Sequence, residues 1–322
     1  MKFFKNALLF SFTLLILSCS EQNQKFKQEG NSELAKVELL VLGIAQDAGY
    51  PQISCRKECC QKFYSNQVKG EQPTSLALID HESHKIWIFE ASPAFREQWR
   101  LAQDFSAYLD KDVPDGIFLS HAHIGHYTGL MQLGHEALGA KDVQVFAMPR
   151  MKEFLSNNGP WDQLLSHKNI NIQPIDTGTN IRLSKNCSVE AIKVPHRDEY
   201  SETVGFRIFG PSKSVLFIPD IDKWEKWGKD ISNEISKVDF ALLDGTFYGD
   251  GELAGRDMSL VPHPFISESM SLFSGLSSDE KSKIHFIHFN HSNPMLWSKD
   301  HRNSVLENGF RLAETKMTLA LD

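Results

Sequence analysis

Several features that would point to a function class are missing from this sequence. Positive charge is in the minority, with 34 lysines and arginines against 41 acidic residues. No basic cluster with interleaved aromatic residues occurs, so nucleic acid is excluded as the expected partner. No segment repeats at a fixed period, which argues against a solenoid or propeller. A hydrophobic content of 41% and a charged content of 23% are typical of an ordinary globular protein with a sizeable core.

Cysteine is scarce as well. Only five cysteines occur, and Cys55, Cys59 and Cys60 fall within one short segment. This spacing is too close for an ordinary disulfide framework, and a bridge between the adjacent Cys59 and Cys60 would be strained. The residues by themselves leave open a reduced thiol cluster or a disulfide from this segment to Cys187.

Long apolar runs are also absent, apart from a short one near the N-terminus. Residues 7–17 are apolar and follow a basic start, but they are too few to anchor stably across a bilayer. The run ends at Cys19 in a sequence that resembles a bacterial lipobox. We expect residues 1–18 to be a lipoprotein signal peptide, residues 19–36 to carry the lipidated Cys19 and a flexible tether, and residues 37–322 to fold. The protein would then be an exported, membrane-anchored lipoprotein that faces the periplasm; the alternative is a plain cleaved signal peptide with Cys19 incidental.

Three histidines lie in one short loop. His121, His123 and His126 follow an apolar run at residues 116–119 that predicts a buried strand, and residues 127–138 predict the beginning of a helix. Histidines on a strand-to-helix loop can direct neutral imidazole nitrogens at one point. Zinc, iron and manganese sites use such ligands. The triplet therefore predicts a metal site.

Further candidate ligands follow predicted strands. The residue pattern predicts strands at 37–43, 75–80, 85–90, 143–147, 189–194, 203–209, 215–218, 240–243 and 284–287, and helices at 93–109, 151–155, 267–273 and 301–307. His196, Asp220 and His288 each come just after one of these strands. Taken alone, each residue is ordinary, and an aspartate after Pro219 is common in turns. Their joint placement favours a shared metal site.

The histidine loop resembles the His-x-His-x-Asp-His signature of the metallo-β-lactamase superfamily, and the later His, Asp and His follow the order of that superfamily's metal ligands. The resemblance covers residues 37–322. It implies an α/β fold, a four-layer αββα sandwich of two packed mixed sheets flanked by helices. It also implies a first metal position held by His121, His123 and His196, a second held by His126 and His288, and Asp220 as the bridge between them.

One position departs from the signature. Gly125 stands where the superfamily has aspartate, and glycine has no side chain with which to ligate a metal. The resemblance gives that aspartate two roles, as a ligand of the second metal and as the group that orients the attacking water. We therefore expect a weak second position with a single tightly bound Zn²⁺, Mn²⁺ or Fe²⁺, or else a substitute carboxylate such as Asp198 or Asp222.

A narrower resemblance is carried by residues 49–52, 92–93, 244–247 and 288–294, which are similar to segments of the pyrroloquinoline quinone biosynthesis protein B family and its phosphodiesterase relatives. In those relatives a cysteine-rich loop binds a structural zinc. The resemblance implies a structural Zn²⁺ here with Cys55, Cys59, Cys60 and His291 as ligands, although the cysteine spacing departs from the relatives' pattern. Such a site would protect the thiolates from oxidation.

The same relatives suggest roles for two more residues. His263 would contact phosphate or protonate the leaving group, and Asp244 would orient its surroundings, while an exposed loop histidine is the alternative for His263. Together with Asp220 as metal bridge, the predicted function is metal-assisted hydrolysis of a phosphodiester or similar ester in a small-molecule substrate. An oxidative tailoring factor of the pyrroloquinoline quinone pathway and a non-catalytic binding protein are the alternatives. The sequence leaves the substrate open, as well as whether the chain forms a homodimer.

Overall fold

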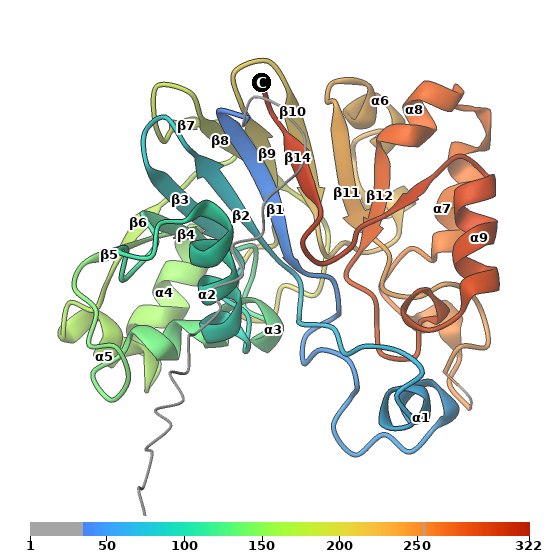
Figure 1. Cartoon of the computed structure of the whole chain (residues 1–322), viewed down its shortest axis with the longest axis horizontal. Helices are drawn as coiled ribbons and strands as arrows, with labels where there is room; N and C mark the ends of the chain where they lie inside the picture. Colours follow the sequence, from blue (N-terminus) through green and yellow to red (C-terminus); the bar gives the residue numbers. More distant parts are fainter. Residues whose placement is uncertain (1–34, 254) are drawn as a thin grey trace, which may run out of the picture. The chain divides into compact units, whose positions relative to one another are not determined.

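Two seven-stranded sheets face each other in the part of the chain that the structure describes, with helices on both outer faces (Figure 1). The computed structural model describes residues 35–253 and 255–322, which belong to a single unit, Ala35–Asp322. The four-layer αββα sandwich expected from the sequence is confirmed. The predicted signal peptide and the lipidation of Cys19 lie outside the described residues and stay predictions.

The strands divide evenly between the two sheets. The first sheet has the order β14-β1-β2-β3-β4-β5-β6, with β1 Val37–Gly43, β2 Ser75–Asp80, β3 Lys85–Phe89, β4 Gly116–Phe118, β5 Val143–Ala147, β6 Ile170–Pro174 and β14 Thr318–Ala320. The second has the order β13-β12-β11-β10-β9-β8-β7, with β7 Asn180–Arg182, β8 Ser188–Lys193, β9 Val204–Phe209, β10 Ser214–Ile218, β11 Phe240–Asp244, β12 Ile284–Ile287 and β13 Arg311–Leu312.

The helices cover the outer faces of the sheets. They are α1 Glu58–Tyr64, α2 Phe95–Ser106, α3 Ile124–Tyr127, α4 Pro149–Asn157, α5 Trp161–Ser166, α6 Ile231–Ser236, α7 Ile266–Leu272, α8 Ser278–Lys283 and α9 Lys299–Glu307. The structure has no α-helix that begins within residues 127–138, where the sequence predicted one. Instead α3 ends at Tyr127, and a 3₁₀-helix continues from there to Leu133. The next residue is Gly134, and glycine is a poor helix former. Among the described residues, no helix combines the length and hydrophobicity needed to cross a bilayer.

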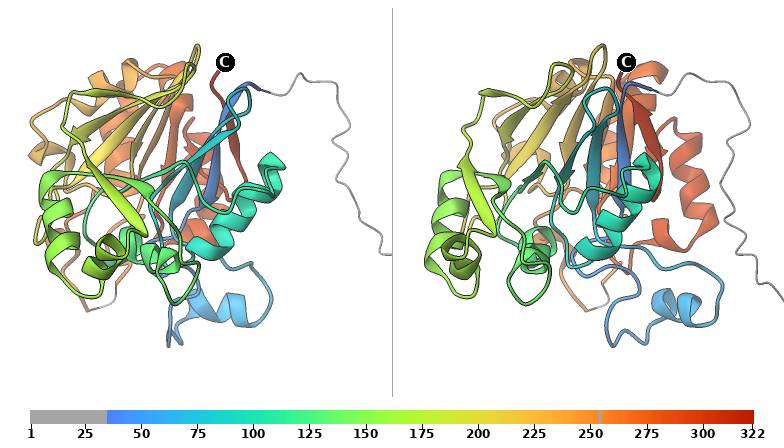
Figure 2. Two further views of the ribbon diagram at one scale, coloured as in Figure 1. Left: turned by 90° about the vertical axis from the view of Figure 1, so that its left-hand side faces the viewer. Right: turned by 60° about the vertical axis from the view of Figure 1, so that its left-hand side comes forward.

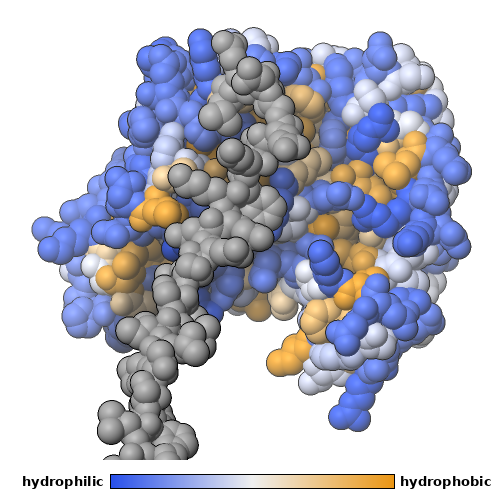
Figure 3. All heavy atoms as spheres, viewed as in Figure 1, coloured by the Kyte–Doolittle hydropathy of each residue, from blue (hydrophilic) through white to orange (hydrophobic). Residues whose placement is uncertain are grey.

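The segment that carries α1 lies apart from the sandwich and protrudes at one end (Figure 2). On the face seen in Figure 3, most of the visible surface is hydrophilic, with hydrophobic side chains between the hydrophilic areas.

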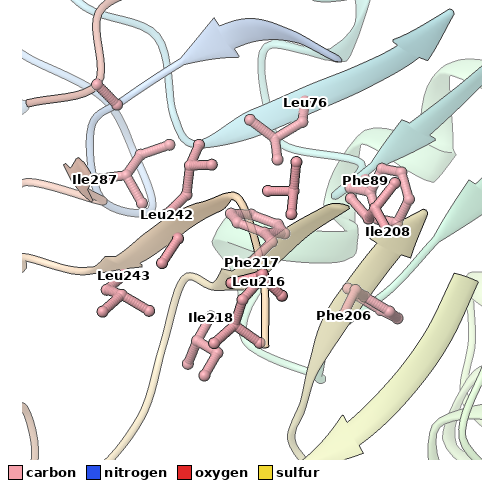
Figure 4. Packing of buried hydrophobic residues seen from close by; sticks show 14 of the residues in the cluster. Leu76, Phe89, Phe206, Ile208, Leu216, Phe217, Ile218, Leu242, Leu243 and Ile287 are labelled. Carbon is pink, nitrogen blue, oxygen red and sulfur yellow. The ribbon is translucent and has the colours of Figure 1, made fainter. Parts of the chain in front are cut away.

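The main core fills the space between the two sheets (Figure 4). Leu76 and Phe89 from the first sheet meet Phe206, Phe217 and Leu242 from the second, and all five are fully buried. The rings of Phe89 and Phe206 lie edge to face with 5.4 Å between centroids, which joins the two sheets directly. Because helices cover the other face of each sheet, the central strands are apolar on both sides, which explains their continuous hydrophobic runs.

Strand directions bring several loops to one edge of the sandwich. In the second sheet β10, β11 and β12 are parallel, and β8 shares their direction because antiparallel β9 separates it from β10. In the first sheet β3 and β4 are parallel, and β1 shares their direction because antiparallel β2 lies between β1 and β3. The carboxyl ends of the strands in each set therefore lie at the same edge of their sheet.

Candidate metal centre

The first group of ligands joins two sheets. His121 and His123 follow β4, and His196 follows β8. Their ligand atoms lie within 4.8 Å of one another, and His121 Nε2 is 2.8 Å from His123 Nδ1. Ser120 Oγ lies 2.8 Å from His121 Nδ1, which fixes the ring with Nε2 toward the group. The structure therefore brings together the three histidines expected at the first metal position.

Asp220 lies at the centre of the site. It follows the end of β10, and its side chain is 3% exposed. Its Oδ2 is 2.9 Å from His126 Nε2, 3.4 Å from His288 Nε2 and 3.6 Å from His121 Nε2. Its Oδ1 is 3.4 Å from His263 Nδ1 and 4.0 Å from His196 Nε2. One carboxylate thus faces both groups of histidines, as a bridging ligand must.

A second group of ligands contains a residue that the sequence analysis missed. This group consists of His126, His288 and Asp47. One ligand atom from each of the three residues lies within 4.8 Å of the other two. Asp47 follows β1, and its Oδ1 is 3.7 Å from His126 Nε2. A lone aspartate in a loop carries no sequence signal, and only its position after a strand with the shared direction could have suggested it.

The two substitute carboxylates named from the sequence lie elsewhere. Asp198 Oδ1 accepts a hydrogen bond from the hydroxyl of Thr203 at 2.8 Å, and Asp222 Oδ2 pairs with Lys226 Nζ at 2.9 Å. Neither belongs to a group of metal-ligand spacing among the described residues. That choice of carboxylate was wrong, because both side chains point to local partners rather than to His126.

The residues of the site fit a bound cation. Among the described residues, the ring nitrogens of His126 and His196, Nε2 of His288 and Oδ1 of Asp220 are buried with no hydrogen-bond partner. Buried polar atoms normally have partners, and leaving several unsatisfied is costly. Donors of a tetrahedral site with bonds of about 2.1 Å lie about 3.4 Å apart, close to the separations seen here. A buried His/Asp site suited to divalent metal is therefore part of the fold.

Protonation also favours metal ligation. Burial lowers the pKa of His288 to about 3 and that of His196 to about 4, so both rings are neutral with a lone pair available. Burial also holds the pKa of His121 well below its ordinary value. Burial opposes ionisation of Asp220, but the surrounding histidines outweigh it and hold its pKa well below its ordinary value.

Glu90 supports His126 from the far side of its ring. It follows β3, is fully buried, and places Oε2 3.3 Å from His126 Nδ1. Burial disfavours the protonated form of His126, yet the charge of Glu90 raises its pKa well above the ordinary value. Glu90 has a φ of 73° and His288 a φ of 68°, a left-handed conformation that is uncommon for non-glycine residues. Glu90 was not among the residues predicted for the site from the sequence.

His263 is not an exposed loop histidine. It is 4% exposed, and its Nδ1 lies 2.8 Å from Asp244 Oδ2. Asp244 is fixed in turn, because its Oδ1 accepts from the backbone N–H and the hydroxyl of Thr246. Burial opposes protonation of His263, but the charges of Asp244 and Asp220 outweigh it and raise its pKa. The structure thus brings both sequence-predicted residues to the edge of the histidine site.

The three clustered cysteines form a separate group near α1. The sulfur atoms of Cys55, Cys59 and Cys60 lie within 4.8 Å of one another. No disulfide occurs among the described cysteines, and Cys187 is buried in the main core instead. His291 is not part of the group; its Nδ1 lies 3.0 Å from Asn290 Oδ1.

Comparison with known proteins agrees with this arrangement. Residues 87–289 match the family described as the beta-lactamase superfamily domain. This chain belongs to the metallo-β-lactamase superfamily. The coenzyme PQQ synthesis protein B of Acinetobacter baylyi is 26% identical over 286 residues, which cover 80% of this chain and 90% of that protein.

Two solved structures are similar to this superfamily member. Zn²⁺-bound PqqB from Methylobacterium extorquens has a TM-score of 0.72 at 20% identity, with 88% of this chain and 99% of that one covered. A diphosphatase from the PhnP family has a TM-score of 0.61 at 19% identity, with 88% and 96% covered. The likeness to PqqB and its relatives expected from the sequence is confirmed, and so is the fold.

Proposed function

We propose that this protein is a metal-dependent hydrolase that cleaves a phosphodiester or a similar ester. The observation that carries the proposal is the convergence of five histidines on the carboxylate of Asp220, with His263 paired to a second buried carboxylate at the edge. A purely structural metal site is normally closed by four ligands. A site with two ligand groups and an adjacent acid–base pair is suited to catalysis.

Each part of the site has a role in this reaction. Divalent ions, when bound, would supply Lewis acidity that activates a water molecule and polarises the scissile phosphoryl or acyl oxygen. Asp220 would hold the two positions at a fixed spacing. Asp244 would accept a hydrogen bond from the Nδ1–H of His263, so that the proton on Nε2 is the one given to the departing alkoxide. This acid supports cleavage of an ester with an alkoxide leaving group, a phosphodiester included, because an alkoxide leaves readily only when it is protonated.

A role in coenzyme PQQ synthesis is the second candidate. It is favoured by the similarity to coenzyme PQQ synthesis protein B over most of the chain. Histidine and carboxylate ligands suit iron as well as zinc, so the site is compatible with oxidative chemistry. Iron as the resident metal, with oxygen uptake and no ester hydrolysis, would favour this candidate over the hydrolase.

The test of hydrolysis combines metal content with turnover. We expect the purified protein to contain divalent metal by mass spectrometry and to hydrolyse bis(4-nitrophenyl) phosphate. Chelation should abolish turnover, and adding back Zn²⁺ or Mn²⁺ should restore it. A protein with full metal content that hydrolyses neither this diester nor simple carboxylic esters would contradict the proposal and favour a binding role.

We also propose that the cysteine cluster holds a structural zinc ion. Burial raises the pKa of the Cys60 thiol to about 12, so three neighbouring thiolates are stable only with a cation among them. The protein supplies three sulfur ligands from the cluster. His291, the fourth predicted ligand, lies outside this group with its Nδ1 near Asn290 Oδ1, so its side chain would have to turn toward the sulfur atoms to complete the tetrahedron.

Replacing Cys59 by serine should remove one equivalent of zinc and leave the histidine site filled. The matched control is Cys187→Ser, which also removes a buried thiol but lies outside the cluster. Metal content by mass spectrometry checks both variants. Unchanged zinc in Cys59→Ser, with the chain folded by circular dichroism, would rule out the structural zinc.

A further inference from the structure

We propose that Asp47 supplies the carboxylate of the second metal position, in place of the aspartate that the superfamily signature has at residue 125. The inference rests on the proposed metal site and names the ligand that completes it. It replaces the expectation of a weak second position with that of a complete one.

The contact between Asp47 and Gly125 is the first argument. A Cβ atom added at Gly125 would lie 2.4 Å from Asp47 Cα and 2.4 Å from Asp47 Oδ1. No real Cβ tolerates such distances from backbone, so residue 125 has no room for a side chain while Asp47 is in place. The aspartate of the signature and Asp47 would occupy the same space. Glycine at 125 is therefore the complement of Asp47 rather than a simple loss.

The donor geometry is the second argument. Asp47 Oδ1, His126 Nε2 and His288 Nε2 surround a point that Asp220 Oδ2 also faces. The distances from His126 Nε2 are 3.7 Å to Asp47 and 2.9 Å to Asp220, which bracket the edge of about 3.4 Å expected of tetrahedral donors. Glu90 cannot take this role, because it faces Nδ1 on the other side of the His126 ring.

The loop that carries Asp47 is attached to the loop of another ligand. The backbone N–H of Gln46 donates to the carbonyl of Phe289 at 2.8 Å, and that of Phe289 donates to the carbonyl of Ile44 at 2.8 Å. Phe289 directly follows His288, so the two ligands are held in register by main-chain hydrogen bonds. Asp47 has a φ of 37°, in the left-handed region that aspartate tolerates better than most residues.

Exposure distinguishes Asp47 from the other ligands. Its side chain is 41% exposed, whereas those of His126 and His288 are at most 1% exposed. Asp47 is thus the solvent-facing ligand, and replacing it leaves no unpaired charge in the core. This makes it suitable for substitution without loss of the fold.

The test exchanges the carboxylate between the two positions. We expect Asp47→Gly to bind one equivalent of divalent metal fewer than the unmodified protein, with the affinity of the second position lowered at least about 100-fold. Asp47→Gly combined with Gly125→Asp should regain the lost equivalent, because the carboxylate returns from the other chain segment. Asp222→Gly removes a nearby carboxylate that pairs with Lys226 and should keep every equivalent.

Metal content by mass spectrometry and calorimetric titration with Zn²⁺ are the readouts, and circular dichroism establishes folding. If the double variant does not fold, Asp47→Asn keeps the side-chain volume and should still lose the second equivalent. Retention of all metal in the folded Asp47→Gly and Asp47→Asn variants would overturn the proposal. Loss of the equivalent in a protein without hydrolytic activity would support Asp47 as a ligand and contradict only the proposed function.

Discussion

Replacing Asp220 by asparagine should lower hydrolysis of bis(4-nitrophenyl) phosphate at least about 1,000-fold, more than the 10–100-fold that loss of an outer partner costs. The expected cause is that both metal positions share this carboxylate, which lies 2.9 Å from His126 Nε2 and 3.6 Å from His121 Nε2. An amide of the same size keeps the packing but removes the negative charge. We expect both ions of the histidine site to be lost, while the cysteine cluster keeps its metal.

The matched control is Asp222→Asn, the same substitution two residues further along. Asp222 is partly buried and pairs with the exposed Lys226 rather than with the histidines, so turnover and metal content should stay close to those of the unmodified protein. Steady-state kinetics and metal analysis of the two variants, side by side, provide the measurement. If Asp220→Asn kept both ions and most of its turnover, the bridging role would be wrong.

Replacing His263 by alanine should lower kcat about 100-fold for a diester with a poor leaving group, such as diphenyl phosphate, within the range typical of general acid catalysis. The expected reason is loss of the proton that His263 holds next to Asp244, at a hydrogen bond of 2.8 Å. Bis(4-nitrophenyl) phosphate should be affected much less, because 4-nitrophenolate leaves without protonation. Metal content should not change. The measurement is kcat for both diesters in both proteins.

His285→Ala is the control for this variant. His285 is also a buried histidine, but it lies in β12 and its Nδ1 contacts the carbonyl of Lys283 rather than the site. We expect His285→Ala to show no selective loss of kcat for the diester with the poor leaving group. An equal loss for both leaving groups in His263→Ala would show that His263 acts through structure or metal binding, and not as the acid.

Much of the fold could be predicted from the pattern of apolar residues. The strands at residues 37–43, 75–80, 143–147 and 284–287 were found with their bounds, and the other predicted strands were found to within two residues. The strands that were missed are the edge strands of the two sheets, β6, β7, β13 and β14. β14 has three residues, and it forms only because its backbone pairs with β1, with Leu319 opposite Leu39. Such pairing depends on a distant segment and leaves little pattern in the sequence.

The sequence by itself determined the sandwich and the histidine centre, because buried strands need continuous apolar runs and a metal site needs clustered imidazoles, and both are visible locally. Only the tertiary structure decided which carboxylate stands beside His126. Asp47 and Gly125 are far apart in the chain, and nothing near either one marks them as neighbours. They meet because β1 and β4 end at the same edge of one sheet, where a glycine leaves the space that the aspartate fills.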